Sequence, residues 1–183
     1  KKTQDQSFDA IMQKFSSNIY GSSKGKLRHK VLMHVLHKYI NLKEKSLDII
    51  DVGGGTGIMS QEMLSLGHKL TFNDLSGEAV ELAKQNLIDF EHVEFHQSSL
   101  SELGFNHSFD LVICHAVLEW LNDPLAAIKK IIEMSGDGGF VSLSFFNKDA
   151  HRFGNILYGN FDYVEADMQN KNTVRLNPNR ALS

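Results

Sequence analysis

Residues 47–57 have the sequence Leu47-Asp-Ile-Ile-Asp-Val-Gly-Gly-Gly-Thr-Gly57, and this stretch decides the fold of the chain. Its first six residues are mostly apolar, which is typical of a strand covered on both faces of a parallel sheet. The glycines let the backbone turn sharply and leave room for a ligand against it. Residues 57–66 predict a helix whose first backbone N–H groups point at that ligand. The order of strand, turn and helix indicates a nucleoside-containing cofactor.

The spacing of the glycines distinguishes between such cofactors. A dinucleotide fingerprint requires G-x-G-x-x-G, but Ile58 or Ser60 stands where the third glycine is needed. The pattern present, D-x-G-x-G-x-G, begins at Asp51 and resembles motif I of the class I S-adenosylmethionine (SAM) methyltransferases. In that family the turn accommodates the amino-acid end of SAM, the motif acid contributes to the polar lining, and an acid ending the second strand binds the ribose hydroxyls. Asp74 stands at that last place, and a carboxylate can accept two hydrogen bonds from a diol. The alternative is a glycine turn without a ligand.

The composition favours one domain in a reducing compartment. With 183 residues and 42% hydrophobic content, the chain is long enough to bury a core. A single cysteine, Cys114, rules out an internal disulfide, and its apolar neighbours predict a buried side chain rather than a nucleophile. The sequence contains no apolar stretch near the ~20 residues of a membrane span, and its first residues lack an apolar signal region. We therefore expect a cytoplasmic protein without membrane contact.

The net charge of −3 hides an asymmetry along the chain. Residues 1–45 hold ten Lys or Arg against three Asp or Glu, a balance of +7. Residues 46–183 hold nine against nineteen, a balance of −10. A basic N-terminal part on an acidic domain indicates contact with a polyanion, and the alternative is a solvated helix face.

Alternating helix and strand patterns predict an α/β fold with a doubly wound, mainly parallel sheet. Strands are expected at 47–52, 69–74, 92–96, 109–114 and 139–146. Helices are expected at 8–15, 27–40, 57–66, 77–88 and 123–135. The second helix carries Leu27, Val31, Val35 and Tyr39 on one face. In such sheets ligands bind at the carboxyl ends of the strands.

We expect a single domain over residues 1–183, with a basic helical cap (1–45), a cofactor-binding core (46–147) and a substrate-side segment (148–183). Class I methyltransferases normally finish with a further helix and an antiparallel pair of strands. The residues after Asn147 look like a polar tail instead. Either the sequence is incomplete at its C-terminus or the sheet is short, and the first is expected because the fifth strand would otherwise lie near an exposed edge.

Blocks outside the glycine turn resemble one family more closely. They are Phe15-Ser-Ser-Asn-Ile-Tyr-Gly21, Lys24-Gly-Lys-Leu-Arg28, His115-Ala-Val-Leu-Glu-Trp120 and Gly159-Asn-Phe-Asp-Tyr-Val164. With the triple glycine, they are similar to the bacterial tRNA 5-carboxymethoxyuridine methyltransferases over nearly the whole chain. The resemblance implies SAM as the cofactor, tRNA with a modified wobble uridine as the partner, and a methyl ester as the product. The cofactor contacts expected from this resemblance and from motif I are Arg28, Asp51, Gly53, Gly54, Gly55, Asp74, Ser99 and His115.

The predicted N-terminal cations and His115 each have two interpretations. The resemblance assigns Arg28 to the SAM carboxylate or to closing the site, since a guanidinium suits a carboxylate, but it could also be an exposed cation. Lys24, Lys26 and Lys30 either contact phosphates or form a solvated face. His115 ends the fourth predicted strand, which favours a role in the site over that of a buried core histidine.

Three aromatic residues are candidates for the substrate side. Tyr20, Phe161 and Tyr163 either stack on the acceptor nucleotide or pack a lid. His34 and His37 are three residues apart on one predicted helix, but no Cys, Asp or Glu accompanies them in the sequence there, so we expect no metal.

The sequence therefore predicts a SAM-dependent tRNA methyltransferase that acts on the carboxylate of a wobble-uridine modification. Ser98 and Ser99 stand where many members of the superfamily place an acid that binds the adenine amine, so that contact is expected to be weaker. One alternative is a small-molecule carboxyl methyltransferase on the same fold. Another is a SAM-binding module without catalytic activity.

Overall fold

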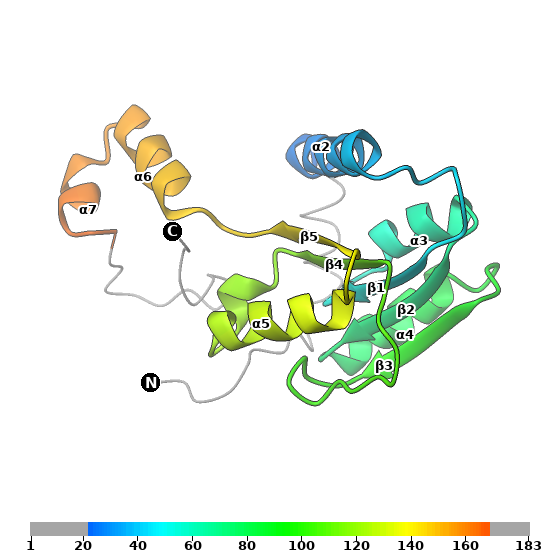
Figure 1. Ribbon diagram of the computed structural model, residues 1–183. Coiled ribbons are helices and arrows are strands. Elements are labelled where there is room, and N and C mark those ends of the chain that lie inside the picture. The colour runs from blue at the N-terminus through cyan, green and yellow to red at the C-terminus, as the bar shows by residue number, and fades with distance from the viewer. Residues whose placement is uncertain (1–21, 169–183) are drawn as a thin grey trace.

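The computed structural model describes residues 22–168, which form a parallel sheet of five strands with helices on both faces (Figure 1). The strands lie in the order β3-β2-β1-β4-β5. They are β1 (Asp48–Val52), β2 (Lys69–Asp74), β3 (Val93–Gln97), β4 (Leu111–His115) and β5 (Phe140–Ser144). The helices are α2 (Ser23–Tyr39), α3 (Ile58–Ser65), α4 (Gly77–Asn86), the 3-10 helix η1 (Leu118–Trp120), α5 (Pro124–Ser135), α6 (Lys148–Leu157) and α7 (Phe161–Glu165). The predicted doubly wound α/β fold is confirmed.

Each predicted strand is present, and β2 has the predicted bounds. Strand β1 is central and pairs in parallel with both β2 and β4. In this register Val52 lies beside Asn73 on one side and Cys114 on the other. The residues that follow these three positions therefore meet at one edge of the sheet, where ligands of such folds bind.

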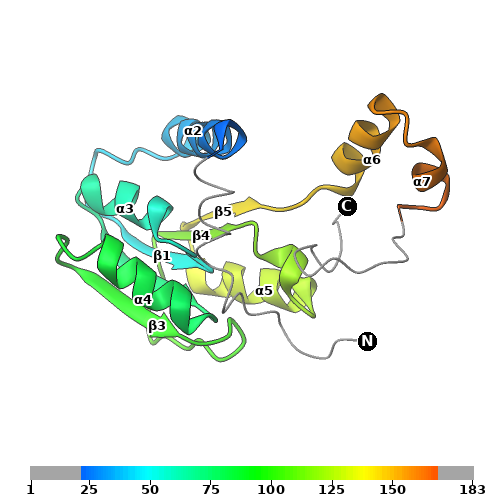
Figure 2. The same ribbon diagram turned by 180° about the vertical axis from the view of Figure 1, so that it is seen from behind.

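Alternating strand residues build a separate core on each face of the sheet. Ile49 and Leu111 belong to the cluster under α2, α3 and α4, whereas Ile50 and Val112 belong to the cluster under α5. All four side chains are fully buried. Helix α5 lies in front of the sheet in Figure 1, and α4 lies in front of it after the half turn in Figure 2. Covering on both faces explains why β4 is an apolar run from Leu111 to Cys114, and why β1 places apolar residues on both of its faces.

Helix α2 is confirmed but begins before the predicted residue 27. Ser22 caps it, because its side-chain oxygen accepts a hydrogen bond from the Gly25 backbone N–H at 3.1 Å. Leu36 of α2 and Ile40, directly after the helix, are buried in the core, and Leu32 and Met33 pack against the same cluster. The predicted apolar row is exposed on the outside of the helix; it consists of Leu27, Val31, Val35 and Tyr39.

The expectation of a polar tail after Asn147 is wrong, since α6 and α7 follow β5. The Asn147 side chain caps α6 by accepting a hydrogen bond from the Ala150 backbone N–H at 2.8 Å. Phe153, Ile156 and Leu157 recur at helical spacing. An asparagine cap followed by this spacing is a helix signal, although the polar residues between them hide it.

Helices α6 and α7 are joined to each other and extend away from the sheet (Figure 1). Asp167, just beyond α7, accepts hydrogen bonds from Lys148 Nζ at 3.2 Å and from an Arg152 guanidinium nitrogen at 3.0 Å. These two cations lower the pKa of the Asp167 carboxyl, with the Lys148 hydrogen bond as the largest cause. Exposed ion pairs therefore join α6 to the residue just beyond α7, in addition to the ring contact between His151 and Tyr163.

Cys114 is fully buried, as predicted, and burial raises the pKa of its thiol. The predicted helix at 8–15 and the candidate Tyr20 lie outside the described residues. No helix within residues 22–168 has the length and apolar character needed to cross a membrane.

Candidate functional site

The glycine turn lies at the carboxyl end of β1 and presents its backbone directly. Gly53, Gly55 and Gly57 have φ angles of 65°, 60° and 78°, a region that favours glycine. A Cβ on Gly53 would lie 2.5 Å from Val117 Cγ2, and a Cβ on Gly54 would lie 2.4 Å from Phe72 Cε2. A Cβ on Gly55 would meet nothing within 4 Å. The turn is therefore packed on its inner side and open at Gly55.

Asp74 ends β2 beside this open part of the turn. One carboxylate oxygen accepts a hydrogen bond from the Gly55 backbone N–H at 3.0 Å, and the other accepts one from the Ser76 N–H at 2.9 Å. Ser76 in turn caps α4. Asn73, one residue earlier, is buried and donates from its side-chain amide to the Ser98 carbonyl at 3.0 Å. The loops after β1, β2 and β3 are thus tied together around Asp74.

Asp51 lies beneath the turn, with 3% of its surface exposed. Its carboxylate accepts a hydrogen bond from the Ser60 hydroxyl at 2.7 Å, which joins β1 to α3. Burial raises the pKa of this carboxyl to about 6, and the neighbouring Asp74 charge acts in the same direction. In this position Asp51 supports the turn from below. Its predicted contact with the cofactor stays a prediction.

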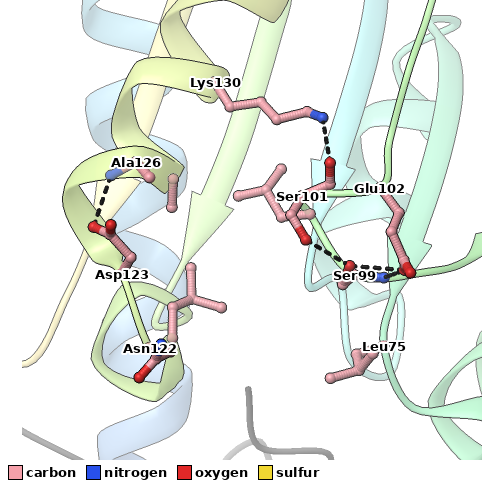
Figure 3. A pocket seen from close by; sticks show the side chains of 11 residues that line it. Leu75, Ser99, Ser101, Glu102, Asn122, Asp123, Ala126 and Lys130 are labelled. Atoms are coloured by element: carbon pink, nitrogen blue, oxygen red, sulfur yellow. Dashed lines mark hydrogen bonds between the residues drawn. The ribbon is translucent and has the colours of Figure 1, made fainter. Parts of the chain in front are cut away.

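A cavity of about 660 Å³ opens between the loop after β3 and the start of α5 (Figure 3). Ser99 lies at its edge, and both its backbone N–H and its hydroxyl donate to Glu102, at 3.2 Å and 2.8 Å. Lys130 closes the opposite side by donating to the Ser101 carbonyl at 2.8 Å. Leu75, directly after Asp74, also lines the cavity. A flat apolar ring with polar edges fits these surroundings.

Glu102 and Lys130 are absent from the predicted site. The contact of Glu102 could have been predicted, because Ser99-Leu-Ser-Glu102 has the spacing of a capping box. In that motif the acid accepts a hydrogen bond from the backbone N–H of the first residue. Lys130 comes from another helix, and no spacing in the sequence links it to the loop.

His115 ends β4, on the other side of the glycine turn. Its Nε2 shares a hydrogen bond of 2.8 Å with the Ser142 hydroxyl on β5, while its Nδ1 is buried and has no partner among the described residues. Burial lowers the pKa of this imidazole to about 4, and the nearby Arg28 and His29 side chains lower it further. His115 is therefore neutral at pH 7 and keeps one ring nitrogen for a further partner.

Helix α2 brings Arg28 to this side of the site. Arg28 is exposed, yet its charge acts on both His115 and Glu119, so it faces the carboxyl end of β4. Lys24, Lys26 and Lys30 are exposed, and none of them forms an ion pair with another residue of 22–168. Among residues 22–168, these three charges therefore remain available to a polyanion.

Of the candidate aromatic residues, the two that the structure describes are not brought to the glycine turn. Phe161 and Tyr163 lie on α7, which stands apart from the sheet in Figure 1. Phe161 is 58% exposed, whereas the Tyr163 ring lies edge-to-face with the His151 ring, with 6.1 Å between the ring centroids. Both interpretations, stacking on a nucleotide and packing of a lid, remain open for these residues.

The described residues contain no group of three or more His, Cys, Asp or Glu side chains arranged to hold a metal. The polar groups around the glycine turn are instead backbone N–H groups, two carboxylates, a neutral imidazole and a guanidinium. Such groups suit a ligand with hydroxyl groups, an amino acid part and a flat ring.

Comparison with known proteins agrees with this geometry. A family model described as a methyltransferase domain matches residues 25–176. The tRNA 5-carboxymethoxyuridine methyltransferase of Escherichia coli (strain K12) is 34% identical over 181 residues, covering 96% of this chain and 69% of that protein. A ubiquinone biosynthesis O-methyltransferase of Haemophilus ducreyi is 30% identical over 131 residues, covering 66% of this chain and 56% of that protein.

Two solved structures share the fold. The magnesium protoporphyrin IX methyltransferase from Synechocystis with bound S-adenosylhomocysteine has a TM-score of 0.66 and 19% identity, covering 86% of this chain and 75% of that chain. The N-methyltransferase from Bradyrhizobium japonicum in complex with S-adenosylhomocysteine has a TM-score of 0.60 and 18% identity, covering 78% of each chain.

Proposed function

Because the chain belongs to the methyltransferase family whose model matches residues 25–176, we propose that it transfers a methyl group from SAM to the carboxylate of 5-carboxymethoxyuridine in tRNA. The observation that carries the proposal is the 34% identity over 96% of the chain to the Escherichia coli enzyme named for that reaction. A tRNA substrate implies a cytoplasmic location, which is part of the proposal. So is the division into a basic cap (1–45), a core (46–147) and a substrate-side segment (148–183).

The residues around the glycine turn fit SAM. Gly53 and Gly54 exclude side chains on the inner side of the turn, and the space beside Gly55 is open, which supports a ligand lying against the backbone. Asp74 places a carboxylate beside the open part of the turn, and the ability of a carboxylate to accept more than one hydrogen bond suits a ribose diol. Ser99 and the cavity beside it would take the adenine.

Arg28 and His115 would bind the amino-acid end of the same cofactor. The Arg28 guanidinium suits its carboxylate, and the buried Nδ1 of neutral His115 offers one hydrogen bond. SAM itself supplies an electrophilic methyl group on a sulfonium. The protein's part is to hold the two reactants in line and to keep water away from them.

The acceptor requires no general base on this proposal. A carboxylate with a pKa near ~4 is already ionised at pH 7. His115 is neutral there and would align the cofactor or the acceptor by a hydrogen bond. The single-turnover rate is therefore expected to stay nearly flat from about pH 6 to 9, and to stay flat in His115→Asn. A single-turnover rate that rises tenfold per pH unit in this range would show that the acceptor must first lose a proton, and would therefore exclude the carboxylate.

The tRNA itself would be bound by exposed lysines around α2 and by the substrate-side segment. Lys24, Lys26 and Lys30 are exposed and unpaired within the described residues, which supports contact with phosphates. Phe161 and Tyr163, together with Tyr20, are proposed to stack on or enclose the modified nucleotide.

A small-molecule methyltransferase is the second candidate, because the ubiquinone biosynthesis O-methyltransferases are about as similar in sequence over a shorter part of the chain. A binding module without activity is the third. The decisive experiment incubates the protein with SAM and two tRNA preparations, one carrying 5-carboxymethoxyuridine and one lacking the carboxymethoxy group. We expect S-adenosylhomocysteine release and the methyl ester, detected by nucleoside mass spectrometry, only with the first. Release with neither tRNA would contradict the proposal, and release with both would exclude the carboxylate as the acceptor.

A further inference from the structure

Glu119 is a buried acid that the reaction described so far does not use. Its side chain is 4% exposed, and its Oε2 is closed off from solvent without a hydrogen-bond partner among the described residues. A buried carboxylate oxygen without a partner is costly, so an acid at such a position normally meets a ligand, an ion or a structural partner. No described residue supplies a hydrogen-bond partner for this oxygen.

Glu119 lies beside the glycine turn. It belongs to η1, and Val117, the residue just before η1, approaches Gly53 so closely that a Cβ there would lie 2.5 Å from its Cγ2. Backbone N–H groups of Glu119 itself and of Phe146, beyond β5, stabilise the Glu119 carboxylate. The acid is thus held by the backbone at the carboxyl ends of β4 and β5, where the amino-acid end of the cofactor is proposed to lie.

Arg28 faces Glu119 from helix α2 without pairing with it. The Arg28 charge acts on the Glu119 carboxyl and on His115. Yet no ion pair joins Arg28 to Glu119 within the 4.0 Å limit for such contacts. Two opposite charges at one site that do not contact each other suit a ligand that carries both charges. An α-amino acid has an ammonium and a carboxylate on one carbon atom.

We propose that Glu119 binds the α-ammonium group of the cofactor's amino-acid end, opposite Arg28, which takes its carboxylate. This assignment rests on the proposed function, since it requires SAM at the glycine turn. A neutral His115 beside the pair adds no positive charge that would repel the ammonium. Burial raises the pKa of the Glu119 carboxyl and Arg28 acts against this, so an arriving ammonium would further favour the ionised form.

The test compares two ligands on three proteins by calorimetry. The ligands are S-adenosylhomocysteine and its analogue in which hydrogen replaces the α-amino group. The proteins are the wild type, Glu119→Gln and the control Glu133→Gln, which makes the same change at an exposed position of α5. Glutamine keeps the size of the side chain and removes its charge.

We expect Glu119→Gln to weaken S-adenosylhomocysteine roughly 10- to 100-fold and to leave the affinity for the deaminated analogue nearly unchanged, because a charge-assisted hydrogen bond is lost only with the first. Glu133→Gln should alter neither affinity. If Glu119→Gln weakens both ligands equally, the acid only positions η1 and the inference is overturned.

The wild-type protein gives a second, independent measurement should Glu119→Gln fail to fold. The wild type must prefer S-adenosylhomocysteine to the deaminated analogue, and equal affinities would overturn the inference while leaving the proposed function intact. A wild type that binds neither ligand would overturn the proposed function and this assignment together.

Discussion

Replacing Gly53 with alanine tests how the glycine turn is built. The φ angle of 65° at Gly53 costs an L side chain about 1–2 kcal/mol. The new Cβ would also stand 2.5 Å from Val117 Cγ2, and such overpacking costs about 1–3 kcal/mol. We therefore expect Gly53→Ala to lower the free energy of unfolding by about 2–5 kcal/mol. Urea denaturation of the purified proteins measures this value.

Two further variants separate the contributions of strain and contact. Gly55 has a φ angle of 60°, but a Cβ there would have no atom within 4 Å. Gly55→Ala should therefore lower the free energy of unfolding only by the backbone strain, about 1–2 kcal/mol. Val117→Ala in the Gly53→Ala background should relieve the clash and so restore part of the lost free energy of unfolding. The coupling energy between the two positions should be on the order of 1 kcal/mol or more. Equal losses for the two glycine variants, with no recovery from Val117→Ala, would refute the argument that η1 packs against the turn.

Three other predictions address the cofactor, the tRNA and pH. Asp74→Asn should weaken S-adenosylhomocysteine roughly 10- to 100-fold in calorimetry, because it removes a charged acceptor; an unchanged affinity in the folded variant would exclude Asp74 from the site. Changing Lys24, Lys26 and Lys30 to alanine should reduce the salt dependence of tRNA binding by up to about three phosphate contacts while the affinity for S-adenosylhomocysteine stays the same; an identical salt slope would indicate a merely solvated face. The pKa of His115 lies below its usual 6.5, at about 4, so the unfolded chain takes up this proton first and the folded state loses stability as the pH falls between these values. His115→Asn should remove that part of the pH dependence, on the order of 3 kcal/mol, and a variant whose urea midpoints follow the wild-type pH profile would contradict the assignment.

The parts of the fold that local chemistry determines were predictable from the sequence. The strands β1 and β4 are recognisable because covering on both faces makes them mostly apolar, and the turn is recognisable because three of its positions need glycine. Asp74 was predictable for the same reason, since an acid that directly follows a buried strand must lie at its carboxyl end. These signals all lie within a few residues of the feature that they predict.

Features that depend on contacts between distant elements were not predictable. Helix α2 carries two apolar rows, and only the position of the sheet decides that Leu36 packs inward while Val31 stays exposed. The surroundings of Glu119 form only when β4, β5 and α2 are assembled. Phe146 and Arg28, which both act on its carboxyl, lie 27 or more residues away along the chain. Asp51 looks like a ligand residue in the motif, and its place beneath the turn follows from the contact with Ser60.

The connection of α6 and α7 to the rest of the molecule has a consequence for local stability. The two helices contact each other, and Asp167 joins them through exposed ion pairs, whereas the sheet has cores of its own. Such pairs weaken as the ionic strength rises. The two helices should therefore open as one cooperative unit at a free energy well below that of global unfolding, and exchange their amide hydrogens faster in high salt while the amides of β1 and β4 remain protected.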